Sequence, residues 1–220
     1  MVSLLNFFNT DFDYPGIEIK VEFAVMQEYL SHLETGIKAV CDSYVKTEES
    51  KFNNAEYLEY QYIYTVAEDY MPRIIRMPFV VTIYTLFENS VNQLLNYAQD
   101  KEAKPIRFTK DCDGNSPASK YNKYLADVLD FDFQFNNQVV QAISDINAVR
   151  NCIAHANGNL DSLSQKRIKM IKNIEKQKIG ISTDTYHLDI TYEFLNNSML
   201  TVSGAVENLM EFIEARYGFR

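Results

Sequence analysis

The sequence predicts an all-α protein, an antiparallel helical bundle with one small β-hairpin near the C-terminus. Two observations support this fold class. Apolar residues recur every three or four positions over most of the chain, which is the period of an amphipathic helix. Only 7 Gly and 5 Pro occur among the 220 residues, and this is few for a fold of short strands and turns.

Length and composition fit a single domain over residues 1–220, with an N-terminal helical extension at 1–75 and a helical bundle at 78–217. The hydrophobic fraction of 46% and the charged fraction of 23% are typical of a globular chain rather than a disordered one. The formal net charge of −9 argues against a protein that coats nucleic acid through a broad basic surface. A local basic site is still allowed, because cations cluster in segment 165–178.

Three helices are expected in the first half of the chain, over Ile17–Lys46, Ala55–Tyr70 and Phe79–Gln99. Pro72 and Pro78 are expected to interrupt the helical structure between the second and the third of these helices. Four tyrosines of the second helix are expected to pack inside the protein rather than to stack on bases: Tyr57, Tyr60, Tyr62 and Tyr64.

The polar segment 100–117 predicts a loop, and Ser116 followed by Pro117 predicts the start of a helix that runs to about Asp130. The next apolar period, from about Asn136 to His155, predicts another helix. Asn157-Gly158 just beyond it is a typical signal for a helix C-terminus.

The period then indicates a basic helix over Asp161–Lys176, followed by a change to short apolar runs. Ile179–Ser182 and Tyr186–Tyr192 are separated by only three residues and predict a β-hairpin. A final amphipathic helix is expected over Glu193–Tyr217.

The cysteines give no sign of a metal or a disulfide framework. Cys41, Cys112 and Cys152 are odd in number and far apart, and no paired Cys or Cys/His spacing occurs. No signal peptide and no apolar run of membrane-spanning length is found. We therefore expect a cytoplasmic protein that uses no metal and no cofactor and does not enter a membrane.

The candidate site lies at the predicted end of the helix that finishes at His155. A His that titrates near neutral pH can take a proton from a 2′-hydroxyl or give one to a leaving oxygen. The guanidinium of Arg150 can hold a phosphate and stabilise developing charge, and this chemistry needs no metal. Asn151 lies four residues before His155 and shares its helix face.

A structural interpretation of the same residues is also open. His155 can cap the helix end, and Arg150 can pair with an acid such as Asp145. His32 is expected to be a surface residue or a half-buried packing residue, and His187 is expected to be a structural residue of the hairpin.

Three further groups are candidates. Lys166, Arg167 and Lys169 are either a solvated helix face or a track for an RNA backbone. Glu88 and Asn89 interrupt an apolar helix, as an interior polar contact or as supporting partners of the site.

The segment from Arg150 to His155 resembles the Arg–polar–x3–His motif of HEPN-domain ribonucleases, and the likeness extends over roughly 78–217. The resemblance implies an all-α bundle in which Arg150 and His155 are the catalytic pair and Asn151 supports them. It also implies a homodimer with two motifs in one cleft, and a role as a toxin or an antiviral-defence enzyme with an antitoxin or inhibitor protein as partner.

The sequence therefore predicts a metal-independent endoribonuclease that cleaves RNA by attack of the 2′-hydroxyl. The alternative is a non-catalytic helical interaction or nucleotide-binding module that docks onto a partner protein.

Overall fold

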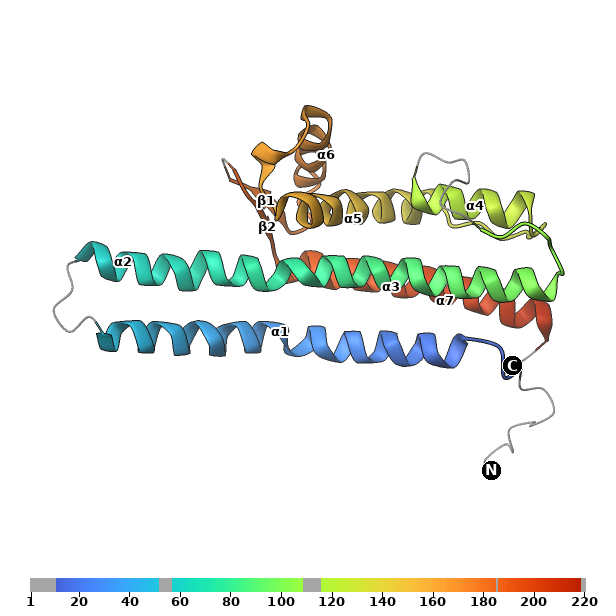
Figure 1. Ribbon diagram of the computed structural model, residues 1–220, viewed down its shortest axis with the longest axis horizontal. Coiled ribbons are helices and arrows are strands. Elements are labelled where there is room, and N and C mark those ends of the chain that lie inside the picture. Colours follow the sequence, from blue (N-terminus) through green and yellow to red (C-terminus); the bar gives the residue numbers. More distant parts are fainter. Residues whose placement is uncertain (1–10, 52–56, 109–115, 185, 219–220) are drawn as a thin grey trace, which may run out of the picture. The chain divides into compact units, whose positions relative to one another are not determined.

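The computed structural model describes residues 11–51, 57–108, 116–184 and 186–218, and it confirms a mostly helical protein with one hairpin near the C-terminus (Figure 1). Its helices are α1 Gly16–Lys51, α2 Tyr57–Thr65, α3 Met71–Lys101, α4 Pro117–Asp127, α5 Asn137–Ala156, α6 Gln165–Glu175 and α7 Tyr192–Tyr217. A π-helical turn, Val66–Tyr70, joins α2 to α3, and the short 3-10 turn Leu160–Ser162 follows α5. The antiparallel hairpin consists of β1 Ile181–Thr183 and β2 Leu188–Ile190.

The chain divides into two compact units, and both take residues from either side of the predicted boundary at 75–78. The first unit contains the segments up to Ala24, Tyr84–Asp145 and from Leu200 onwards. The second unit contains Val25–Ile83 and Ile146–Met199.

The core of the first unit is rich in aromatic side chains. The rings of Phe87 on α3 and Tyr121 on α4 pack with their centroids 5.9 Å apart, and both side chains are buried. Asn122 fixes the link to α5, because its amide donates to the carbonyl oxygen of Phe135 and accepts from the Phe135 N–H, both at 2.8 Å. Ser116 caps α4 as expected, since its hydroxyl accepts from the Ser119 N–H.

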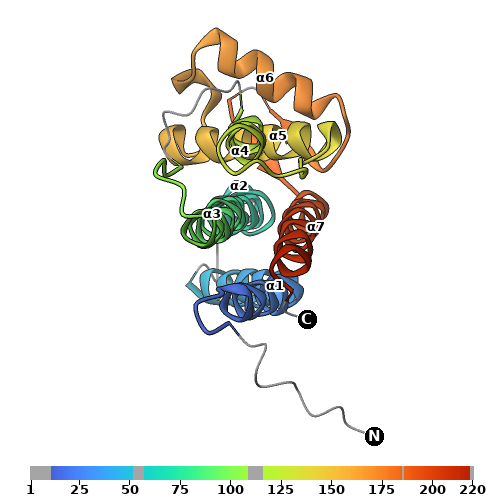
Figure 2. The ribbon, with the colours of Figure 1, turned by 90° about the vertical axis from the view of Figure 1, so that its right-hand side faces the viewer.

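In the second unit, α1 runs antiparallel to the α2–α3 segment, and Figure 2 shows α1 and α2 side by side. The Tyr64 hydroxyl donates to Glu49 at 2.7 Å, and Arg76 donates two hydrogen bonds to Glu34 at 2.8 and 2.6 Å. Glu34 precedes Glu49 on α1, but its partner Arg76 follows Tyr64, the partner of Glu49. The two helical segments therefore run in opposite directions.

The expected break at Pro72 and Pro78 is wrong, because the chain stays helical through both. Proline has no N–H to donate and its ring clashes with the carbonyl one turn earlier. Ahead of Pro72 the chain widens into the π turn, in which the Met71 N–H donates to the Val66 carbonyl. Pro78 lies inside α3, so the helix begins at Met71 rather than at Phe79.

The expected packing of the tyrosines on α2 is wrong for two of them. The side chain of Tyr62 is 67% exposed and that of Tyr64 is 41% exposed. Tyr60 is half-buried, and the side chain of Tyr57 lies outside the described residues. Cys112 lies outside them as well.

The end of α5 is the one that the sequence predicts. Asn157 and Gly158 have φ values of +49° and +75°, so they leave the helix in the left-handed conformation. The Asn157 N–H donates to the Ile153 carbonyl at 2.8 Å. The Leu188 N–H then donates to the Gly158 carbonyl at 2.9 Å, which fastens β2 to the segment that follows α5.

The hairpin has two distinct faces. Its register pairs Ser182 with Asp189 and Thr183 with Leu188. Side chains alternate along a strand, so Thr183 and Asp189 point to opposite faces. The Thr183 hydroxyl is bonded to Glu175 at 2.9 Å, which places α6 on the Thr183 face.

In the described part of the chain, no helix combines the length and the apolar character that crossing a membrane requires.

Candidate functional site

The arginine of the predicted motif is held by its neighbours on α5. Arg150 is half-buried, and its Nη1 donates to the Asn151 Oδ1 at 2.9 Å. The Asn151 amide nitrogen in turn donates to the Asn147 Oδ1 at 3.2 Å. This chain of side chains orients the guanidinium and the two amides along the last turns of the helix.

His155 has a different environment. Its side chain is exposed in the last turn of α5, and within the described residues the imidazole takes part in no hydrogen bond or ion pair. Five residues separate it from Arg150, which places the two about 140° apart around the helix and about 7.5 Å apart along its axis. The helix thus presents an available imidazole and an oriented guanidinium in directions that diverge by about 140°.

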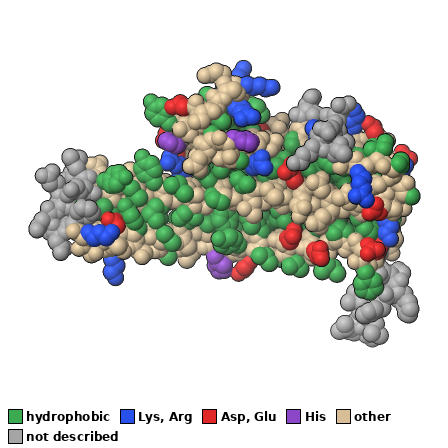
Figure 3. Space-filling model, in the orientation of Figure 1, with side chains coloured by type: hydrophobic (Ala, Val, Ile, Leu, Met, Phe, Trp, Pro, Cys, Tyr) green, Lys and Arg blue, Asp and Glu red, His purple; other side chains and the backbone are tan. Residues whose placement is uncertain are grey.

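The basic residues at the start of α6 are exposed. Lys166, Arg167 and Lys169 form no ion pair with any described residue. Lys172, one turn later, is held by Glu175 at 3.3 Å and by the Thr183 hydroxyl. Figure 3 shows Lys and Arg side chains gathered over α6, where they are accessible to a polyanion.

Glu88 and Asn89 lie on α3 in the first unit, whereas Arg150, Asn151 and His155 lie in the second. Glu88 is half-buried and accepts from the Tyr84 hydroxyl at 3.1 Å, and Asn89 is exposed. Glu88 thus makes the polar contact that the sequence allowed. A supporting role of these two residues at the Arg150–His155 site stays a prediction.

The two other histidines differ from each other. His32 is exposed on α1 and lies 2.9 Å from Glu28, one turn earlier, which confirms a surface residue. His187 on the hairpin is half-buried, and its Nδ1 lies 3.9 Å from the Asp184 carboxylate. It borders a cavity that the sequence does not predict.

This cavity, the hairpin pocket, lies within the second unit and has a volume of about 410 Å³. Its walls come from the π turn, the start of α3 and the hairpin. The lining includes the residues Asp69, Tyr70, Arg73, Asp184, His187 and Asp189. Its size falls within the range of about 300–1,000 Å³ that is usual for small-molecule sites.

Two charged side chains of the hairpin pocket, Arg73 and Asp189, make no hydrogen bond or ion pair with any residue that the structure describes. Arg73 lies over the Tyr70 ring, 5.0 Å from its centroid, and within the described residues it makes no hydrogen bond or ion pair. Asp189 is half-buried and likewise forms no hydrogen bond or ion pair there. Burial raises the pKa of Asp189, and the charges of Asp184 and Asp69 add to this, while the Arg73 charge opposes it.

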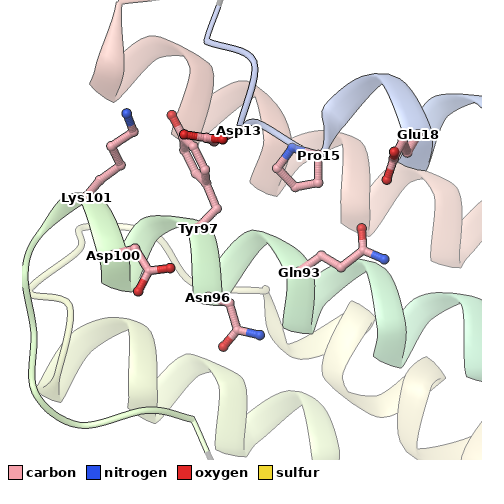
Figure 4. Close-up of a pocket in the computed structure, with 8 residues that line it drawn as sticks. All are labelled: Asp13, Pro15, Glu18, Gln93, Asn96, Tyr97, Asp100 and Lys101. Atoms are coloured by element: carbon pink, nitrogen blue, oxygen red, sulfur yellow. The ribbon is translucent and has the colours of Figure 1, made fainter.

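A second cavity, of about 680 Å³, lies in the first unit (Figure 4). Asp13 borders it from the turn before α1, Glu18 from the first turn of α1, and Asp100 from the end of α3. Its one lysine, Lys101, is already paired with Asp11 at 2.6 Å. Across the described residues, no group of three or more His, Cys, Asp or Glu side chains is arranged to hold a metal ion.

Comparisons of the chain with protein-family models, with curated proteins and with solved structures find no match.

Proposed function

We propose that the protein is a metal-independent endoribonuclease whose site is built on the last turns of α5. His155 acts as general acid and base, Arg150 clamps the phosphate, and Asn151 orients the phosphate or the substrate hydroxyl. The exposed Lys166, Arg167 and Lys169 of α6 bind the RNA backbone.

The chemistry is an internal transfer at phosphorus. The 2′-hydroxyl attacks the adjacent phosphorus, and a base removes the hydroxyl proton as the new P–O bond forms. The bond from phosphorus to the 5′-oxygen breaks, and an acid returns a proton to that oxygen. The products are a 2′,3′-cyclic phosphate and a free 5′-hydroxyl. A fixed guanidinium stabilises the extra negative charge on the phosphoryl oxygens in the transition state.

The observation that supports this assignment best is the contrast between the two side chains. Arg150 is oriented through its bond to Asn151, while His155 is exposed and makes no hydrogen bond within the described residues. A proton-transfer group has to be accessible, whereas a phosphate clamp gains from being held in place.

A second copy of the chain would complete the site. Within one helix, Arg150 and His155 project about 140° apart, so they meet a single phosphate only through the length of the arginine. Two copies that face each other across the ends of their α5 helices can supply the arginine of one and the histidine of the other. We therefore propose a homodimer, which light scattering coupled to gel filtration measures directly.

The test is cleavage of a mixed structured RNA in EDTA by the wild type and by His155→Ala. Only the wild type should cleave, and its products should carry 2′,3′-cyclic phosphate ends. Arg150→Ala should also lower cleavage, by about 100-fold or more if it loses one transition-state donor.

His32→Ala is the matched control, because His32 is also exposed on a helix but lies on α1. It should cleave as well as the wild type. Equal cleavage by the folded wild type, His155→Ala and Arg150→Ala would refute the assignment. Absence of cleavage by the wild type would favour the non-catalytic docking module instead.

A further inference from the structure

The hairpin pocket holds a donor and an acceptor that the protein leaves for a ligand. Arg73 offers guanidinium N–H groups, and Asp189 offers carboxylate oxygens. The two groups interact electrostatically, because the charge of Arg73 lowers the pKa of Asp189. They form no ion pair within 4.0 Å. Burial of an unpaired carboxylate is unfavourable, so a ligand that donates to Asp189 and accepts from Arg73 would relieve that cost.

The charge of the pocket indicates that the bound group is not a phosphate. The lining carries four carboxylates, Glu68, Asp69, Asp184 and Asp189, against the guanidiniums of Arg73 and Arg76. Arg76 is already bonded to Glu34 through two hydrogen bonds. An anion would therefore enter a net negative cavity. A neutral group with both donors and acceptors is favoured.

Among the parts of RNA, guanine matches this pair best. Its O6 and N7 accept from an arginine in the commonest specific base contact. Its N1–H and 2-amino group donate along another edge, where a carboxylate can accept from both. Adenine has no N1–H, and it carries a donor at position 6 where guanine has the O6 acceptor.

An aromatic surface is available beside the pair. Tyr70 is 44% exposed on the π turn and lines the same cavity. Single-stranded RNA is usually read by bases that are unstacked from their neighbours and placed on such rings. The guanidinium of Arg73 lies 5.0 Å from the centroid of the Tyr70 ring, so both residues contribute to the same wall of the cavity.

The hairpin links this pocket to the proposed cleavage site. β2 carries Asp189 and is bonded to Gly158, three residues after His155. The opposite face of the hairpin holds α6 through Thr183 and Glu175. α6 and the pocket therefore lie on opposite faces of the hairpin, and a strand of RNA bound to the cations of α6 has to pass the hairpin to place a base in the pocket.

We propose that the hairpin pocket binds an unpaired guanine base of the RNA, read by Asp189 and Arg73. The inference rests on the proposed function, because it assumes that the ligand is RNA. The inference predicts that the protein prefers single-stranded RNA that contains guanine.

The test is binding of labelled RNA pentamers to the full-length His155→Ala protein in EDTA, measured by fluorescence anisotropy. The central base is guanine, adenine or hypoxanthine, and the other four are uracil. The guanine pentamer should bind about ten-fold more tightly than the adenine pentamer. The hypoxanthine pentamer, which lacks only the 2-amino group, should fall between them.

Asp189→Asn and Arg73→Ala, each made in the His155→Ala background, should reduce the preference for guanine to less than about two-fold. Arg107→Ala is the control, because it removes an exposed guanidinium outside the pocket and should leave the preference unchanged. Equal binding of the guanine and adenine pentamers, or an unchanged preference in Asp189→Asn, would overturn the proposal.

The two proposals fail separately. A guanine preference without cleavage by the wild type would keep the pocket and refute the nuclease. Cleavage that depends on His155, with no base preference in binding, would keep the nuclease and refute the pocket.

Discussion

Replacing Gly158 with Ala tests how the end of α5 is held beside the hairpin. Gly158 is buried at a φ of +75°, a region that side chains disfavour. A Cβ added there would lie 2.5 Å from the Cε of Met77 and 3.7 Å from the Leu188 carbonyl oxygen. Met77 can move, since its methyl group is the end of a flexible side chain. The backbone cannot easily change, because the Gly158 carbonyl accepts from the Leu188 N–H.

Two costs set the size of the effect. The left-handed conformation costs a residue with a side chain about 1–2 kcal/mol. Moving Met77 away from its rotamer adds about 0.5–1.5 kcal/mol. The sum is about 1.5–3.5 kcal/mol of lost unfolding free energy, which for a chain of this size lowers Tm by about 3–14 °C.

The assay is urea unfolding followed by circular dichroism, with Gly36→Ala as the matched control. Gly36 is exposed on α1, and nothing lies within 4 Å of an added Cβ. Alanine there should raise stability by about 0.5–1 kcal/mol, because it is the better helix former. The same substitution should therefore have opposite signs at the two glycines.

An unfolding midpoint of Gly158→Ala at or above that of the wild type would refute this reasoning. The result would mean that the segment after α5 can leave the left-handed conformation without loss of its bond to β2.

Two further predictions concern the first unit. Ser116→Ala should destabilise the protein by about 0.5–2 kcal/mol in urea unfolding, because it removes the hydroxyl that caps α4. Hydrogen bonds from Arg216 and Tyr217 lower the pKa of Glu102, so this group stabilises the fold above its unfolded pKa of about 4.3. That contribution should be lost as pH falls through the lower folded pKa. In Glu102→Gln, the unfolding free energy measured by urea unfolding should change less with pH in this acid range. The same pH dependence as in the wild type would contradict the role given to Glu102.

Local sequence signals predicted the elements that depend on near neighbours. Ser116 caps α4 by a hydroxyl that reaches only three residues along the chain. Asn157 and Gly158 end α5 because both tolerate positive φ. The apolar period located the long helices, since burial of one face repeats at every turn.

Features that depend on distant contacts escaped prediction. A proline forbids one hydrogen bond, but the sequence does not say whether the helix stops or widens around it, as it does before Pro72. The exposure of Tyr62 follows from which face of α2 meets α1, and a helix rich in tyrosine on several faces does not reveal this.

The candidate site was predictable only in part. Arg150, Asn151 and His155 are close in the sequence, so their placement at one helix end follows from the period. Arg73 and Asp189 come from the two separate sequence segments of the second unit and line one cavity because the hairpin packs against the start of α3. Asp189, an acidic residue at the centre of a predicted strand, was the one available sign of this pocket. A strand residue that simply faces solvent would give the same sequence pattern.

Neither compact unit is a continuous stretch of the chain. The second unit joins 25–83 to 146–199, so no single cut separates it from the first. A fragment that begins at Tyr84 would keep α5 but lose Met77, which packs against Gly158. A single continuous fragment of the chain therefore cannot contain the whole compact unit around His155. Any swap of this region between proteins has to exchange two segments at once.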